Sequence, residues 1–277
     1  MSLPEQVRNE FMTMLAYVKK YRDVPYNDPT AMPIRAAFYE PPKCLENYIA
    51  KLMTLADKAE TVGLAKLEQN EIGNLLESVA YAAFRGLAGA SSVTNFTSAT
   101  AQIDLLVKGD GQLWDLVCGW LFAKSPGSIV VECKATQEPV SDSQFARLCS
   151  LLDTNWAQTG FLGVFFSLKG ATGFPEPGDD VAKRKIGQAC LRQVIYHAKS
   201  DKSVIVFDKK DIAALLKPGM LLDLMIRKIQ EIEELRGRDV GPVEILDPKS
   251  LPPHLRVVEA EITAATSSAS NGGAGEA

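Results

Sequence analysis

The sequence Ser-Ile-Val-Val-Glu-Cys-Lys, residues 128–134, is the stretch that decides the fold. Side chains alternate between the two faces of a β-strand, so this pattern predicts a strand that carries Glu132 and Lys134 on one face, beside apolar Val130. A face that is apolar at one end and charged at the other is typical of the rim of a site. A Glu and a Lys two residues apart also occur on the solvated face of a half-buried sheet, and this alternative stays open.

A second acidic residue lies upstream in a shorter strand-like run at 103–107. Asp104 is expected to face away from the apolar residues that alternate along this strand. These are Ile103, Leu105 and Val107. If the two strands are neighbours, Asp104 and Glu132 meet at one end of the sheet.

A third acidic residue is predicted on a helix. Apolar residues at helical spacing predict an amphipathic helix over residues 72–87, and Glu77 falls on the shoulder of its apolar stripe. From there a carboxylate would reach over the sheet edge toward Asp104 and Glu132.

The order of these motifs resembles the PD-(D/E)xK nuclease superfamily and, within it, the Mrr-like restriction-endonuclease branch. The matching segments are NEIGNLLESVAYAAF (70–84), QIDLLV (102–107), IVVECKA (129–135), GFLGVFFSLKGATG (160–173) and SVIVFDKKDIAAL (203–215), about half of the chain. The resemblance implies that Asp104 and Glu132 are metal ligands, that Glu77 supports the metal site and that Lys134 is the catalytic lysine. Two positions depart from the family pattern, because Ile103 replaces its proline and Gln102 replaces an acidic residue. Residues 108–127 form an insertion that the resemblance does not explain.

The residue types agree with hydrolysis of phosphodiester bonds by a metal-dependent nuclease. Carboxylate oxygens are hard ligands that favour Mg²⁺ or Mn²⁺ over zinc. The two histidines, His197 and His254, do not form a cluster, which argues against a histidine-based nuclease. Lys134 is expected to orient a water molecule and to offset negative charge. Alanine at Asp104 or at Glu132 is expected to abolish cleavage and metal binding while the fold stays intact.

The substrate is expected to be DNA, although RNA is not excluded. The net charge of −4 provides no general attraction for nucleic acid, so local cationic and polar groups must supply it. The candidates are Gln144, Arg147, Lys169, Thr172, Lys183, Arg184 and Lys185. Ordinary solvated surface or turn chemistry explains these residues equally well.

A partner is expected to present the substrate or control the nuclease. By analogy with the family, this partner is a helicase or sensor in bacterial antiviral defence or restriction, or a second copy of the chain. The N-terminal helices at 4–62, or the apolar stripe of 220–236 with Leu221 and Met225, are predicted to be free as docking surfaces. The alternative is that these helices pack against the core of their own chain. The alternative function is a catalytically inactive nuclease-fold subunit that binds nucleic acid or acts as a scaffold.

The whole chain is predicted to be an α/β protein with a restriction-endonuclease-like core, in which helices flank a central mixed sheet. The core spans 66–217, between a helical extension at 1–65 and a C-terminal helix and extended segment at 218–262, with a disordered tail at 263–277. Further helices are predicted at 4–21, 41–62, 112–123, 140–152, 180–199, 209–216 and 220–236, and strands at 91–97, 160–168 and 203–207. Five unpaired cysteines and the lack of a signal or membrane-spanning segment indicate a cytoplasmic protein with no membrane partner.

Overall fold

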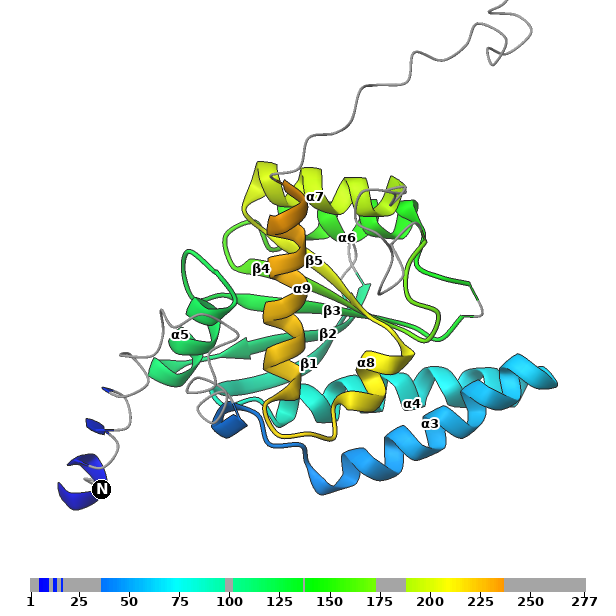
Figure 1. Cartoon of the computed structure of the whole chain (residues 1–277), viewed down its shortest axis with the longest axis horizontal. Coiled ribbons are helices and arrows are strands. Elements are labelled where there is room, and N and C mark those ends of the chain that lie inside the picture. The colour runs from blue at the N-terminus through cyan, green and yellow to red at the C-terminus, as the bar shows by residue number, and fades with distance from the viewer. Residues whose placement is uncertain are drawn as a thin grey trace, which may run out of the picture. The chain divides into compact units, whose positions relative to one another are not determined.

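The computed structural model describes residues 5–9, 12, 13, 16, 36–97, 102–136, 138–172 and 188–236. The elements from α3 to α9 belong to one compact unit (Figure 1). Most of the helix predicted at 4–21, the first part of the helix predicted at 180–199, and the segment and tail predicted after residue 236 lie outside the described residues.

A five-stranded mixed sheet forms the centre of this unit, in the order β1-β2-β3-β4-β5. The strands are β1 (Ala90–Thr97), β2 (Gln102–Gly109), β3 (Ser128–Lys134), β4 (Gly160–Ser167) and β5 (Ser203–Phe207). β1, β2 and β3 pair antiparallel, whereas β3, β4 and β5 pair parallel. The expected α/β architecture with a mixed central sheet is therefore confirmed.

Helices cover both faces of the sheet and give it two hydrophobic cores (Figure 1). The helices α3 (Lys43–Thr61), α4 (Lys66–Arg85) and α9 (Met220–Arg236) contribute to one core, and α6 (Asp142–Thr154) and α7 (Gln188–Ser200) to the other. Along β4, Val164 enters the first core and Phe165 the second. This strand is therefore covered on both faces, as its continuous apolar run predicts.

The predicted docking stripe on α9 is part of the core. Leu221 and Met225 are both fully buried, so the prediction that this stripe is a free docking surface is wrong. The inner face of α3 is equally buried, with Leu45 and Leu52 inaccessible to solvent. Both helices bury these faces because an amphipathic stripe can be satisfied by the chain's own sheet as well as by a partner.

The insertion at 108–127 folds as helix α5 (Gly111–Trp120) against the same core. Trp114 is 1% exposed, and its indole Nε1 donates a hydrogen bond to the carbonyl of Gly127 at 2.9 Å. A methyl group added to Gly109 would lie 2.2 Å from the Trp114 ring, so only glycine permits this approach. Trp114 and Trp120 are both buried in the core.

The side chain of Ile103 lies on the opposite side of the sheet from the one that the sequence predicts. It packs in the α6–α7 core, whereas Leu105 and Val107 pack in the α4–α9 core. The cause is a register shift between β1 and β2. Thr94 pairs with Leu106, but the next pair in the ladder lies two residues further along β1 and three residues back along β2, at Ile103, so β2 has one extra residue here. A bulge of this kind interrupts the two-residue alternation on which the prediction depends.

The remaining helix, α8 (Lys209–Ala214), follows β5 directly. Among the described residues, no helix combines the length and the apolar character that crossing a membrane requires.

Candidate active site

The two strands that carry Asp104 and Glu132 separate at the position of these residues. The ladder between β2 and β3 runs from the pair Val107–Ile129 to the pair Leu105–Val131. At the next position, the Oδ2 atom of Asp104 accepts a hydrogen bond from the backbone N–H of Cys133 at 2.6 Å. The Asp104 carboxylate thus occupies the fork between the strands and is held by the backbone of the Glu-x-Lys segment.

Glu132 is the most deeply buried charged side chain of this fork, with 2% of it exposed. Its Oε1 atom lies 2.9 Å from the Nη1 atom of Arg147, and its Oε2 atom lies 3.4 Å from the Nζ atom of Lys134. Burial raises the pKa of the Glu132 carboxyl, the positive charge of Lys134 opposes this rise, and the negative charge of Asp104 adds to it. Asp104 and Glu132 are therefore close enough to repel each other.

Lys134 lies at the carboxyl end of β3, beside Ser167 of β4. Its side chain is 24% exposed, so its ammonium group is reachable from solvent while it remains paired with Glu132. A cation in this position can donate hydrogen bonds to a water molecule or to a phosphate oxygen.

Glu77 approaches the fork from α4 and is half-buried. Burial raises the pKa of its carboxyl, and the charge of Asp104 raises it further. The pKa of the Cys133 thiol is raised mainly by burial, and also by the charges of Asp104, Glu77 and Glu132. The three carboxylates and Lys134 therefore form a group whose charges all act on Cys133, and within it Asp104 acts on both Glu77 and Glu132.

The donor set of this group suits a hard divalent cation, but it is not assembled around a common point. In the described ranges, no three Asp, Glu, His or Cys side chains are arranged so that they could hold a metal ion together. The mutual repulsion of Asp104 with Glu77 and with Glu132 is the kind that a bound cation relieves. The residue types of the group thus suit Mg²⁺ or Mn²⁺, while in this structure one oxygen of Glu132 contacts Arg147.

The two candidate residues on α6 have different roles in the structure. Gln144 uses its Oε1 atom to accept a hydrogen bond from the backbone N–H of Ser141 at 2.8 Å, which caps the start of α6. Its carboxamide oxygen therefore points to the helix terminus. Arg147, one turn later, is the residue that reaches Glu132.

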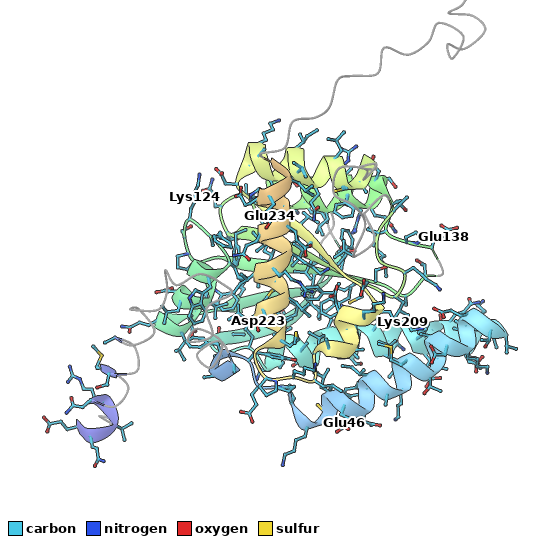
Figure 2. All side chains as sticks on the ribbon, in the orientation of Figure 1. Glu46, Lys124, Glu138, Lys209, Asp223 and Glu234 are labelled. Carbon is cyan, nitrogen blue, oxygen red and sulfur yellow. The ribbon has the colours of Figure 1, made fainter. Side chains whose placement is uncertain are left out.

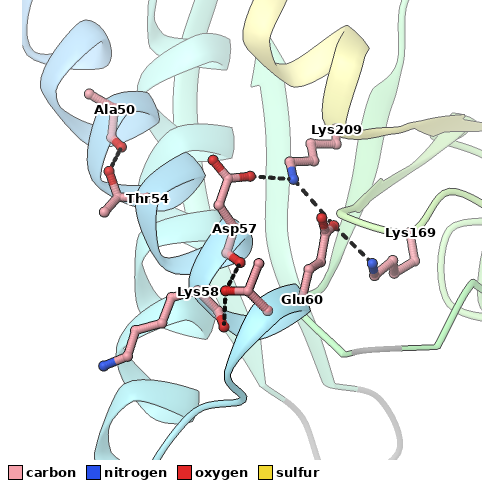
Figure 3. A network of polar contacts seen from close by, with 8 residues as sticks. Ala50, Thr54, Asp57, Lys58, Glu60, Lys169 and Lys209 are labelled. Atoms are coloured by element: carbon pink, nitrogen blue, oxygen red, sulfur yellow. Dashed lines mark hydrogen bonds and ion pairs between the residues drawn. The ribbon is translucent and has the colours of Figure 1, made fainter.

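Lys169 is held by the N-terminal part of the chain. Lys169 and Lys209 both contact the Oε1 atom of Glu60, at 2.9 and 3.2 Å, and Lys209 also contacts Asp57 at 2.7 Å (Figure 3). Hydrogen bonds from Lys169 and then Lys209 lower the pKa of the Glu60 carboxyl. This network ties α3 to the segments that follow β4 and β5. Thr172 is exposed in the turn after β4, and its backbone N–H donates to the carbonyl of Val140 at 3.0 Å.

Lys183, Arg184 and Lys185, the other predicted nucleic-acid contacts, lie outside the described residues.

A serine, a histidine and a glutamate also come together away from the fork. The ring of His197 lies 3.0 Å from the Oγ atom of Ser203 and 2.7 Å from the Oε1 atom of Glu233. Ser203 is only 5% exposed, so its hydroxyl is inaccessible to a substrate. This arrangement joins α7, β5 and α9 and is structural.

In comparisons with known proteins, no family model matched this sequence and no curated protein matched it.

Proposed function

We propose that the chain is a metal-dependent nuclease that hydrolyses phosphodiester bonds, with DNA as its first candidate substrate. The observation that carries this proposal is the fork itself, where the Glu-x-Lys strand and the Asp104 strand separate. There Asp104 is anchored by the Cys133 N–H at 2.6 Å, and a buried Glu132 lies against Lys134. A restriction-endonuclease-like core and a role in antiviral defence with a partner are parts of the same proposal.

Asp104 and Glu132 would hold the cation, with Glu77 assisting from α4. When bound there, Mg²⁺ or Mn²⁺ would stabilise the charge that develops on the scissile phosphate and lower the pKa of a water molecule. The chain's own residues position the reacting groups. The Cys133 N–H prevents the Asp104 carboxylate from rotating, and Glu132 holds the Lys134 ammonium at the solvent-facing side of the fork. From that place Lys134 would orient the attacking water and offset charge on the phosphate.

The experiment is a cleavage assay on supercoiled DNA, single-stranded DNA and RNA with Mg²⁺ or Mn²⁺, combined with calorimetric measurement of Mn²⁺ binding. Lys134→Gln should lower the cleavage rate by about 10²–10⁴-fold, the usual contribution of a positioned catalytic group, and leave Mn²⁺ binding in place.

A matched control for Lys134→Gln is Lys124→Gln. Lys124 is 78% exposed and pairs with Asp201. It lies on the other side of the molecule from Glu138, which belongs to the loop that directly follows Lys134 and β3 (Figure 2). Its replacement should leave the cleavage rate unchanged. Full activity in Lys134→Gln, or no cation binding and no cleavage by the wild-type protein, would reject the nuclease proposal.

The second candidate function is a nuclease-fold subunit that binds nucleic acid without cutting it. It is favoured by the contacts of Glu132, because both carboxylate oxygens lie against cations of the protein itself. Under this alternative, the wild-type protein binds DNA but no Mn²⁺, and replacing Asp104 or Lys134 changes neither property.

A further inference from the structure

Arg147 occupies the oxygen of Glu132 that a cation would need. Glu132 is 2% exposed, and its Oε1 atom lies 2.9 Å from the guanidinium of Arg147. Its other oxygen lies 3.4 Å from Lys134. A buried carboxylate is tolerated when it is paired, so the two cations together allow Glu132 to be buried in the absence of metal.

The two partners of Glu132 differ in how they are held. Lys134 extends from the same strand as Glu132 and is 24% exposed, whereas Arg147 reaches in from α6 and is 47% exposed. The long side chain of Arg147 can therefore withdraw toward solvent without moving the backbone of α6, which is anchored by the buried residues Phe145 and Leu148. Arg147 is the partner that can leave.

A divalent cation and a guanidinium cannot share one carboxylate oxygen at close range, because like charges repel strongly in a partly buried site. A guanidinium released from Glu132 remains beside the fork, and its planar set of donors suits a phosphate.

We infer that Arg147 is an exchange residue that neutralises Glu132 in the metal-free protein, leaves Glu132 when a divalent cation binds, and then pairs with a phosphate of the nucleic acid. This inference rests on the proposed nuclease function. It also explains why the carboxylates of Asp104, Glu132 and Glu77 suit a metal ion chemically but are not arranged around a common point. Metal binding and substrate binding are then coupled, since the cation releases the residue that holds the phosphate.

The test uses the full-length protein and two readouts that should change in opposite directions. Removing the competing charge in Arg147→Gln should tighten Mn²⁺ binding by roughly tenfold, because the metal ion no longer competes with a guanidinium for this oxygen. The cleavage rate at saturating Mn²⁺ should fall by roughly tenfold or more, because the phosphate loses its guanidinium. Calorimetry measures the first effect without reference to activity.

Two further variants separate exchange from a structural role. Arg147→Lys keeps the positive charge, so its Mn²⁺ affinity should stay close to that of the wild-type protein. Arg192→Gln is the matched control, because Arg192 pairs with Asp142 at the start of α6 and is 43% exposed, and its loss should leave Mn²⁺ affinity unchanged.

The outcomes distinguish this inference from the function on which it rests. Tighter Mn²⁺ binding in Arg147→Gln, with slower cleavage, supports the exchange. Wild-type binding of Mn²⁺ with equal or weaker binding by Arg147→Gln overturns the exchange and leaves the nuclease proposal intact. A failure of both proteins to bind Mn²⁺ rejects the metal site and the exchange together.

Discussion

Replacing Asp104 should separate its role in the fold from its role toward a cation. Its Oδ2 atom accepts the backbone N–H of Cys133 at 2.6 Å, in the place where the β2–β3 ladder has ended. In Asp104→Asn the amide oxygen can still accept this hydrogen bond, whereas in Asp104→Ala the Cys133 N–H loses its partner. Both substitutions remove the same negative charge, so both relieve the repulsion with Glu132 equally.

The difference between the two variants therefore measures the hydrogen bond. A buried or half-buried donor that is left unsatisfied costs about 1–3 kcal/mol, so Asp104→Ala should be less stable than Asp104→Asn by about that amount. In a domain of this size, such a loss lowers the melting temperature by about 2–12 °C. The fold is still expected to stay intact in Asp104→Ala, but at lower stability, so asparagine is the better substitution for testing function.

The assay is urea denaturation followed by tryptophan fluorescence. All three tryptophans, Trp114, Trp120 and Trp156, are at least 92% buried, so their emission reports on the packed core. Neither variant should bind Mn²⁺ as the wild-type protein does. Equal unfolding free energies for the two variants would show that the Cys133 N–H does not depend on Asp104, and the account of the fork would then be incorrect.

Two further predictions concern the packing that supports the fork. Met225→Ala should lower the free energy of unfolding by about 2–5 kcal/mol, because Met225 is fully buried, and denaturation should show this loss with or without a partner protein. Gly109→Ala should sharply lower thermal stability, because its methyl group would lie 2.2 Å from the ring of the tryptophan in α5. Gly119→Ala is the matched control, since nothing lies within 4 Å of its added carbon and alanine gains about 0.5–1 kcal/mol over glycine in a helix.

The positions of the elements could be predicted because apolar periodicity records which side of each element is buried. The strand at 128–134 begins and ends where the sequence predicts, and the helix predicted at 220–236 begins at Met220 as expected. Helix α4 begins at Lys66, whereas the sequence predicts a start at residue 72. The sequence does not reveal the true start because Leu67 in the first turn is exposed, so this turn does not continue the buried apolar stripe. In that turn the Glu68 side chain accepts the backbone N–H of Ala65 at 3.0 Å, a capping contact visible in sequence only as a short motif.

The contacts of the site were less predictable than its residues. The pattern Ser141-x-x-Gln144 is that of a capping box, and this signal could have assigned Gln144 to the start of α6 in advance. Nothing in the sequence indicates that a backbone N–H anchors Asp104, because every residue except proline carries that donor. The pairing of Arg147 with Glu132 depends on how α6 packs on the sheet, which periodicity within α6 or β3 does not determine.

The burial of the Glu-x-Lys pair decides between the two explanations that its sequence leaves open. On the solvated face of a half-buried sheet, Glu132 and Lys134 would both be exposed, because neither charge gains from leaving water. Instead Glu132 is 2% exposed, and the exposed fraction rises to 24% at Lys134, where β3 reaches its end. A carboxylate in this place must be compensated by charge, and the protein supplies it from Lys134 on the same strand and from Arg147 on a different element. A surface pair would need no second cation. The arrangement is therefore that of an enclosed anionic group beside a solvent-facing lysine, with the guanidinium of Arg147 as its second cation. Under the proposed exchange, a divalent cation would take the place of that guanidinium.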